Sequence, residues 1–246
     1  MEFASSSSTA SEVPILTKEV RTMVLVGRTG NGKSATGNSI LGKKVFESTA
    51  RQCGVTASCE MHTAELNNGG LIVNVIDTPG LFEVSNGSQF IGKEIVKCID
   101  FAKDGIHAIL VVLSVRSRFS EEEENALRSL RTLFGSKIVD YMIVAFTGGD
   151  DLEANEETLD DYLGRGCPET LKEILTLCGN RRVLFNNRTK DEEKKSEQVQ
   201  QLLSFVNMVV SNNDGRPYID ESFTEQITEM GCTFWRTELL LHHLGY

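Results

Sequence analysis

The chain has 246 residues, of which 40% are hydrophobic and 24% are charged, a balance that suits one substantial folded domain and excludes disorder of the whole chain. Its 35 acidic residues outnumber its 25 basic ones, and the net charge of -10 disfavours non-specific binding to nucleic acid or anionic lipid. The six cysteines form no CxxC pair, so we interpret them as reduced intracellular thiols, with a disulfide framework as the alternative.

The sequence lacks the usual signals of secretion or of a membrane span. Its longest apolar run, 106–115, is far shorter than the roughly 20 residues that cross a bilayer. The N-terminus lacks the charged-then-apolar layout of a signal peptide. Residues 1–19 are Ser-rich and aperiodic, so we expect a flexible tail there, followed by one domain over 20–212 and a helical extension or tail over 213–246. These features predict a cytoplasmic protein.

From residue 20 onward, apolar and amphipathic segments alternate, which predicts an α/β fold with a mostly parallel sheet covered by helices on both faces. The predicted strands span 21–26, 58–66, 71–76, 106–115, 141–146 and 182–185. The turn signal Asn67-Asn68-Gly69-Gly70 joins the second and third strands into a hairpin, which adds one antiparallel edge.

The predicted helices span 33–41, 159–163, 168–178, 196–210 and 217–230, with a charged stretch over 190–195 between elements. One more helix begins after Ser120, because Ser120 as N-cap and Glu123 three positions later form a capping box. The acidic run 121–124 is explained by the attraction of negative charge to a helix N-terminus, in preference to a partner-binding role.

The stretch GRTGNGKS matches the phosphate-binding pattern GxxxxGK[ST] between a predicted strand and a predicted helix. Its glycines let the backbone curl until several N–H groups point at phosphates, and the following helix adds the positive end of its dipole. Lys33 is expected to reach the β and γ phosphates, and the Ser34 hydroxyl is expected to ligate Mg²⁺. The expected lining residues are Gly27, Arg28, Thr29, Gly30, Asn31, Gly32, Lys33, Ser34 and Ala35.

A second motif, Asp77-Thr78-Pro79-Gly80, directly follows the strand 71–76. An Asp at a strand end beside a P-loop suits the role of holding Mg²⁺ through water. The backbone N–H of Gly80 is placed to sense the γ phosphate. The two motifs together predict a site for a nucleoside triphosphate and Mg²⁺.

The order of P-loop, hairpin and DxxG resembles the small G proteins of the Ras type. The resemblance implies a Thr that ligates Mg²⁺ when the γ phosphate is bound, and Thr56 is better placed for this role than Thr49. It also implies an Asp that accepts hydrogen bonds from guanine. By its spacing and the Leu that follows, Asp151 takes that place, with Asp150 as the alternative.

The base-reading motif departs from the usual Asn-Lys-x-Asp, since Thr147 is followed by two glycines and then by the two aspartates. The missing Lys would lie over the base plane, so its absence puts affinity in doubt more than base choice. After the last strand, Asn186 and Asn187 are expected to pack on the base, with Arg188 beside them. Thr147 is included among the residues expected at the nucleotide.

Further stretches closely resemble the AIG-type GTPases, named GIMAP in animals and IAN in plants, with most likeness to the plant branch. They are VTxxC at 55–59, FTGGDDLE at 146–153, FNNRTK at 185–190 and DGIHAILVVLSVRSRFSEEE in the middle of the chain. The resemblance covers about residues 20–230. It implies a Ras-like P-loop G domain of the TRAFAC class, related to septins and plastid import GTPases, with GTP or GDP and Mg²⁺ as ligands.

The same resemblance implies nucleotide-dependent dimerisation across the binding face, a role in immune or stress responses, and, for full-length members, a coiled coil or an anchor that associates them with an intracellular membrane. Leu81 stands where Ras-type enzymes carry the Gln that orients the attacking water, which predicts slow hydrolysis. The groups that are candidates to compensate, with none singled out, are Arg28, Arg51, Gln52, Glu83 and Ser85.

The leading prediction is therefore a weak GTPase that acts as a nucleotide-dependent switch. A nucleotide-gated scaffold with negligible hydrolysis is the competing class, and a P-loop ATPase or kinase is disfavoured by the hairpin order and the lack of a lid motif. His62 and His107 are expected to serve packing or hydrogen bonding, and Cys53 has no assigned partner that would activate it.

Overall fold

The computed structural model describes residues 18–48, 56–66, 69–80 and 88–219. Six strands form one sheet in the order β2-β3-β1-β4-β5-β6, and only the β2–β3 pair is antiparallel. This arrangement confirms the predicted α/β class and its antiparallel edge. The strands are β1 (Glu19–Val26), β2 (Glu60–Leu66), β3 (Leu71–Asp77), β4 (Ala108–Ser114), β5 (Met142–Thr147) and β6 (Arg182–Phe185).

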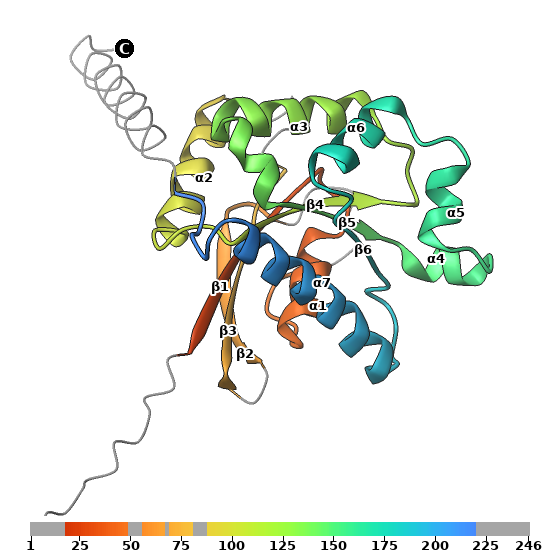
Figure 1. The fold of residues 1–246 in the computed structure, drawn as a ribbon, viewed down its shortest axis with the longest axis horizontal. Coiled ribbons are helices and arrows are strands. Elements are labelled where there is room, and N and C mark those ends of the chain that lie inside the picture. Colours follow the sequence, from red (N-terminus) through yellow and green to blue (C-terminus); the bar gives the residue numbers. More distant parts are fainter. Residues whose placement is uncertain (1–17, 49–55, 67–68, 81–87, 220–246) are drawn as a thin grey trace, which may run out of the picture.

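Helices cover both faces of the sheet, with α2, α3 and α6 on one face and α1 and α7 on the other (Figure 1). Each face has its own apolar core, because the parallel strands carry apolar side chains on both sides. Across the described residues, every helix is too short or too polar to cross a bilayer. The helices are α1 (Lys33–Leu41), α2 (Ser88–Phe101), α3 (Glu121–Phe134), α4 (Gly149–Ala154), α5 (Leu159–Gly164), α6 (Glu169–Leu177) and α7 (Glu192–Asn212), with a 3₁₀ helix η2 (Ser136–Tyr141).

Several element bounds differ from those predicted, and local contacts explain them. The prediction of a connecting stretch over 190–195 is wrong from Glu192 onward, because Asp191 caps α7 by accepting hydrogen bonds from the N–H groups of Glu193 and Lys194. Helices α2 and α4 were not predicted. Gly92 lies within the sequence of the first and Gly149 begins the second, and glycine weakens the propensity of a segment to form a helix.

The described beginning of the C-terminal segment packs on the domain. The helix predicted from 217 is wrong for residues 217–219, since Tyr218 pairs with Ile106 in an isolated antiparallel bridge. The Tyr218 ring also packs edge-on against Phe134 and Tyr141. The rest of that predicted helix lies outside the described residues, and the domain boundary at 212 stays a prediction.

Candidate functional site

The carboxyl ends of the parallel strands bring the predicted site residues to one edge of the sheet. Strand β1 ends at Val26 before the P-loop, β3 at Asp77, β4 at Ser114, β5 at Thr147 and β6 at Phe185. Strand β1 lies between β3 and β4, so the chain connections leave it in opposite directions. In open α/β sheets, ligands bind outside the carboxyl ends of the strands at such a point.

The P-loop has a backbone that requires glycine at defined positions. Gly27, Gly30 and Gly32 have φ values of 148°, 87° and 91°, a region that residues with a side chain rarely adopt. A Cβ atom at Gly27 would lie 2.4 Å from the carbonyl oxygen of Val112, whereas one at Gly30 would meet no atom within 4 Å. The loop therefore presses against β4 at its start and curls over open space at its middle.

Lys33 holds its charge inside this curl. Its side chain is only 5% exposed, and Nζ donates hydrogen bonds to the carbonyl oxygens of Gly27, at 2.8 Å, and Arg28, at 3.1 Å. Helix α1 begins at Lys33 with Gly32 as its N-cap, which supplies no side-chain acceptor for the first N–H groups. An ammonium group and a helix N-terminus thus meet where a phosphate group fits both.

Three predicted Mg²⁺ ligands, Ser34, Thr56 and Asp77, meet at the start of α1. The Ser34 hydroxyl donates to Asp77 Oδ2 at 2.6 Å, the Thr56 hydroxyl donates to the same oxygen at 3.3 Å, and the two hydroxyl oxygens are 3.1 Å apart. Asp77 is 1% exposed, and its Oδ1 atom is buried with no hydrogen-bond partner. Burial raises the pKa of Asp77, while the Ser34 hydroxyl and the Lys33 charge oppose that shift.

This donor set fits a hard divalent cation. Mg²⁺ prefers oxygen ligands and is held in nucleotide sites by one or two side chains together with phosphates. The unpartnered Oδ1 atom of Asp77 is a buried carboxylate oxygen that lacks the interaction its burial requires. A cation, or a water bound to one, would satisfy it. Within the described part of the chain, no three His, Cys, Asp or Glu side chains form a separate metal cluster.

Both candidate base-reading aspartates lie in the first turn of α4, after Gly148 in a left-handed conformation. They are bound by Arg116, which follows β4: Nε is 2.7 Å from Asp151 Oδ2, and Nη2 is 2.5 Å from Asp150 Oδ2. Arg188 adds a longer contact of 3.4 Å to Asp150. Sequence reasoning did not single out Arg116, because no motif joins a residue after β4 to one after β5.

The side chains of Asn31 and Thr147 face the protein and hold the P-loop in place. Thr147 donates its hydroxyl to the carbonyl oxygen of Asn31 at 2.7 Å. The Asn31 amide donates to the carbonyl oxygen of Val112 at 3.0 Å and to Glu123 Oε1 at 2.8 Å. Both residues were expected at the nucleotide, and their observed contacts show that they shape the loop around it.

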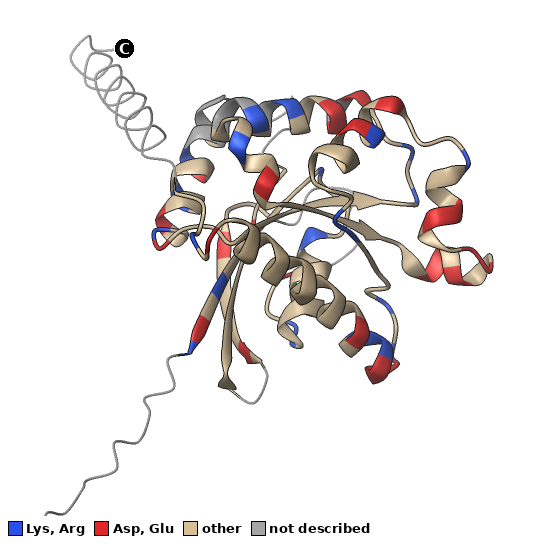
Figure 2. Cartoon of the chain, in the orientation of Figure 1, with Lys and Arg blue, Asp and Glu red and all other residues tan. Residues whose placement is uncertain are grey.

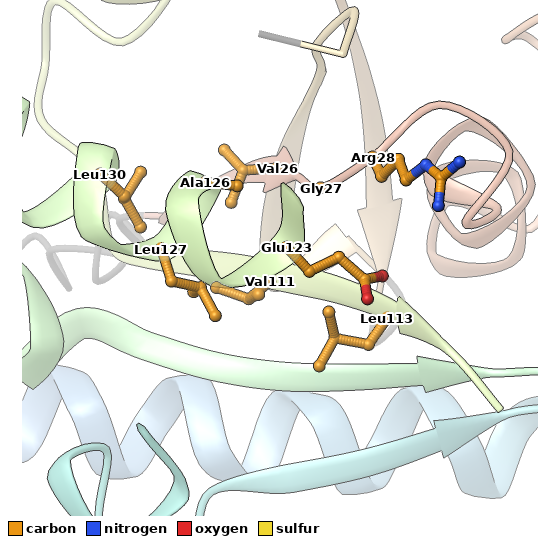
Figure 3. Close-up of a pocket in the computed structure, with 9 residues that line it drawn as sticks. All are labelled: Val26, Gly27, Arg28, Val111, Leu113, Glu123, Ala126, Leu127 and Leu130. Atoms are coloured by element: carbon orange, nitrogen blue, oxygen red, sulfur yellow. The ribbon is translucent and has the colours of Figure 1, made fainter. Parts of the chain in front are cut away.

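Glu123 completes the predicted capping box of α3, which is confirmed. Its carboxylate accepts from the Ser120 N–H at 2.9 Å, and its own N–H donates to the Ser120 hydroxyl at 3.3 Å. Glu123 also contributes to a small cavity behind the P-loop, where its carboxylate extends away from the apolar side chains of Leu127 and Leu130 (Figure 3). Gly27 and Arg28 of the P-loop also line this cavity, and most of the remaining lining is apolar.

The two asparagines after β6 tie neighbouring elements to the base-reading loop. Asn186 donates from Nδ2 to Glu153 of α4 at 3.1 Å. Asn187 donates to the Thr36 hydroxyl at 3.0 Å and accepts from the Ser39 hydroxyl at 2.8 Å, both on α1. Their packing on the base stays a prediction. The observed contacts fix the loop that would carry them.

The segment after Thr56 is anchored to α2 through a buried carboxylate. Glu94 accepts from the Cys59 N–H at 2.5 Å and from the Ser58 hydroxyl at 3.1 Å. These bonds replace strand pairing, which explains why β2 begins at Glu60 and not at the predicted residue 58. A hydrogen bond with Cys98, together with burial, raises the pKa of the Cys59 thiol far above its ordinary value, so this thiol stays protonated.

The two histidines have the structural roles expected of them. His62 packs edge-on against Phe46. His107 accepts a hydrogen bond from the Thr22 N–H through Nδ1, and burial lowers its pKa. Among the catalytic candidates, Arg28 is exposed on the P-loop. The other predicted residues of the switch segments lie outside the described residues: Thr49, Arg51, Gln52, Cys53, Leu81, Glu83 and Ser85.

Comparison with known proteins adds a family match over most of the chain. The model of the AIG1 family matches residues 21–238. The chain is 62% identical over 224 residues to immune-associated nucleotide-binding protein 9 of Arabidopsis thaliana, an alignment that covers 91% of this chain and 62% of that relative. The chain therefore spans less than two thirds of the length of this relative.

Solved structures share the fold at low sequence identity. Toc33 from Arabidopsis thaliana in complex with GDP and Mg²⁺ superposes with a TM-score of 0.58 at 18% identity, over 82% of this chain and 88% of Toc33. A second solved structure belongs to work on the chloroplast translocon components atToc33 and psToc159, for which dimerization is stated to be important for the GTPase activity. It superposes with a TM-score of 0.59 at 20% identity, over 79% of this chain and 84% of that one.

Proposed function

Because this chain belongs to the AIG1 family, we propose that it is a guanine nucleotide-binding protein that takes GTP or GDP with Mg²⁺ at the carboxyl edge of its sheet. Two features of one edge of the sheet carry the proposal: the Lys33 ammonium lies inside the glycine curl, and the buried carboxylate of Asp77, whose pKa the Lys33 charge affects, has one oxygen without a partner. The phosphates supply the charge that Lys33 is placed to receive, and the cation supplies the contact that Asp77 lacks.

The roles of the residues follow from their contacts. Lys33 exchanges the carbonyl oxygens of Gly27 and Arg28 for phosphate oxygens, and the N–H groups at the start of α1 bind the same phosphates. Ser34, Thr56 and Asp77 are the residues that would hold Mg²⁺, because their oxygens are the ligands that this ion prefers. Mg²⁺ bound there would neutralise charge on the β and γ phosphates.

For the fate of the nucleotide, we propose slow hydrolysis of GTP to GDP and phosphate. Leu81 cannot orient water by hydrogen bonding, so the isolated chain lacks the group that a Gln provides in Ras-type enzymes. We further propose a nucleotide-dependent homodimer that binds across the nucleotide face and raises the rate. The dimer-dependent activity stated for the chloroplast translocon GTPases supports this proposal.

The biological setting that we propose is an immune or stress response in a plant, in the cytoplasm or peripheral to an intracellular membrane. The naming of the plant relatives as immune-associated nucleotide-binding proteins supports the first part. A nucleotide-gated scaffold with negligible hydrolysis is the second candidate function, favoured by the same Leu81. In both functions the bound nucleotide controls the segments that contain Thr56 and Gly80.

Titration with GDP, GTP and ADP tests the assignment to guanine. We expect GDP and GTP to bind at least a hundredfold more tightly than ADP, because adenine lacks the N1–H donor that a carboxylate accepts. Lys33→Ala should lose nucleotide binding. Wild-type affinity in that variant would contradict the proposal that the P-loop binds the phosphates. Comparable affinity for ADP would contradict the guanine assignment.

Turnover measured over a range of protein concentration separates the two candidate functions. A rate per molecule that rises with concentration supports hydrolysis assisted by a dimer. Leu81→Gln in the same assay should raise the rate at low concentration, because it restores a water-orienting amide. Absence of phosphate release at every concentration supports the scaffold and contradicts the proposed GTPase activity.

A further inference from the structure

Arg116 is the most heavily engaged cation near the predicted base-reading residues. It comes from the turn between β4 and α3, and its guanidinium forks across two neighbouring carboxylates. Nε donates to Asp151 Oδ2 at 2.7 Å, and Nη2 donates to Asp150 Oδ2 at 2.5 Å. The fork geometry of a guanidinium gives it a fixed orientation toward carboxylates that a single ammonium lacks.

The two carboxylates need such a cation because their surroundings are acidic. Asp150 and Asp151 are adjacent in the first turn of α4, and a cation that contacts both offsets the repulsion between their two negative charges. Acidic residues also gather on α4, α5 and the beginning of α7 (Figure 2). Helix α4 has no basic residue of its own, so the counter-charges come from other segments, Arg116 and the more distant Arg188.

The glycines of the motif make room for this arrangement. A Cβ atom at Gly148 would lie 2.9 Å from Val115 Cγ2 and 3.4 Å from Arg116 Cγ, and the φ of 88° there already favours glycine. A Cβ atom at Gly149 would lie 3.0 Å from the backbone nitrogen of Asn186. Gly148 thus leaves room for Arg116 from the turn after β4, and Gly149 leaves room for the backbone after β6.

The two aspartates differ in how fully they are engaged. Asp150 contacts both Arg116 and Arg188, and its side chain is 25% exposed. Among the ion pairs of the described residues Asp151 contacts only Arg116, which donates to Oδ2 from Nε at 2.7 Å and to Oδ1 from Nη2 at 3.4 Å, and its side chain is 47% exposed. Asp150 is therefore the carboxylate that two arginines contact, whereas one arginine contacts Asp151. Asp151 is the one whose oxygens are more open to a ligand.

We propose that Arg116 is the positioning residue of the base-reading site and supplies the cation that the motif lacks, binding Asp150 so that the carboxylate of Asp151 accepts from the guanine edge. The proposal rests on the proposed function, since it assigns roles within the same nucleotide site. Guanine presents the N1–H and amino donors to the two oxygens of Asp151. Arg116 then remains on Asp150 and holds the orientation of the two carboxylates.

Removal of Arg116 should therefore reduce the preference for guanine. In Arg116→Gln the cation that contacts both carboxylates is lost, so Asp151 loses the group that fixes its orientation. We expect GDP to bind at least tenfold more weakly and ADP to change little, because adenine makes no use of the carboxylate. The ratio of the two affinities then falls by about the same factor. A residue that only supported the fold would weaken both nucleotides alike.

The experiment measures GDP and ADP dissociation constants by competition with a fluorescent nucleotide, on the full chain with Mg²⁺. Arg116→Lys keeps the charge without the fork and should give an intermediate ratio. Arg128→Gln is the matched control, because Arg128 is also an exposed arginine in an ion pair, with Glu124 on α3. We expect this control to bind both nucleotides like the wild type. Thermal unfolding of each variant checks that the fold is retained.

Two results would overturn the proposal. One is a wild-type ratio, or tighter GDP binding, in Arg116→Gln, since tighter binding would mean that Arg116 competes with the base. The other is a fall of the ratio in Arg128→Gln equal to that in Arg116→Gln, which would show that the effect does not depend on the contacts of Arg116 with Asp150 and Asp151. Failure of the proposed function is distinguishable, because the wild-type chain itself would then bind ADP as well as GDP.

Discussion

The side-chain amide of Asn31 donates a hydrogen bond of 2.8 Å to the carboxylate of Glu123. This bond joins the phosphate-binding loop to the first turn of α3, where the same carboxylate caps the helix by accepting from the N–H of Ser120. Glu123 is only 4% exposed, so little water is available to replace either bond. The shape of the loop and the start of α3 therefore depend on one buried carboxylate.

Glu123→Ala should destabilise the protein by about 2–3 kcal/mol, because a hydrogen bond to a charged group and a helix cap are lost together. GDP affinity should fall as well, since Asn31 loses the partner that fixes it. Glu121→Ala is the matched control, because Glu121 is exposed in the same turn. Urea unfolding of the two variants checks the prediction, which fails if their free energies of unfolding are equal.

Thr147→Val should lower the free energy of unfolding by about 1–3 kcal/mol, because the buried carbonyl oxygen of Asn31 loses its hydroxyl donor while the side chain at 147 keeps its volume. The variant should also bind GDP more weakly, since this bond holds the P-loop. Thr147→Ser restores the donor and should recover most of the lost GDP affinity. Calorimetric titration of both variants, with thermal unfolding, makes the comparison. A serine variant as weak as the valine variant would show that the methyl group, and not the hydrogen bond, holds the loop.

Asp151→Asn should exchange guanine for xanthine as the preferred base. Its amide keeps one acceptor for N1–H and gains a donor for the carbonyl group that xanthine carries in place of the guanine amino group. Asp150→Asn should retain a preference for guanine, because Asp150 is engaged with Arg116 and Arg188. Competition between GDP and xanthosine diphosphate tests the pair. A xanthine preference in Asp150→Asn instead would reverse the assignment of the two aspartates.

The ligand-free protein should lose stability as pH rises through the titration of Asp77. Burial raises the pKa of Asp77 above its ordinary value of 3.8, so the folded protein binds this proton more tightly than the unfolded chain. The contribution of Asp77 is thus most favourable below pH 3.8 and is lost as pH rises through the raised pKa. Asp77→Asn should remove this part of the pH dependence.

Urea unfolding from pH 4 to pH 8, without nucleotide or Mg²⁺, measures that difference. The same variant should bind GDP more weakly when Mg²⁺ is present, because the amide replaces the carboxylate at the predicted metal position. The Asp77 carboxylate then lowers the stability of the ligand-free protein, and its proposed role is to bind Mg²⁺. A wild-type chain whose stability rises with pH by the same amount as the variant would contradict the account of Asp77.

The residues of the phosphate and metal positions were predictable because each follows a recognisable strand. GRTGNGKS follows the strand that ends at Val26, and Asp77 ends the strand after the hairpin. Parallel strands place their carboxyl ends along one edge, so local patterns were enough to bring Lys33, Ser34 and Asp77 together. Strand β6 and helix α1 have the predicted bounds for the same reason.

The fold class, the family and the glycine-rich loop that we propose binds phosphate follow from the sequence, because short motifs and hydrophobic periodicity encode them locally. Only the tertiary structure decided the pairing of Arg116 with Asp150 and Asp151 and of Asn31 with Glu123. Each pair joins segments that are distant in the chain, and no spacing rule relates them. Their contacts depend on the order of the strands in the sheet and on burial, which set which side chains meet and how strongly they interact.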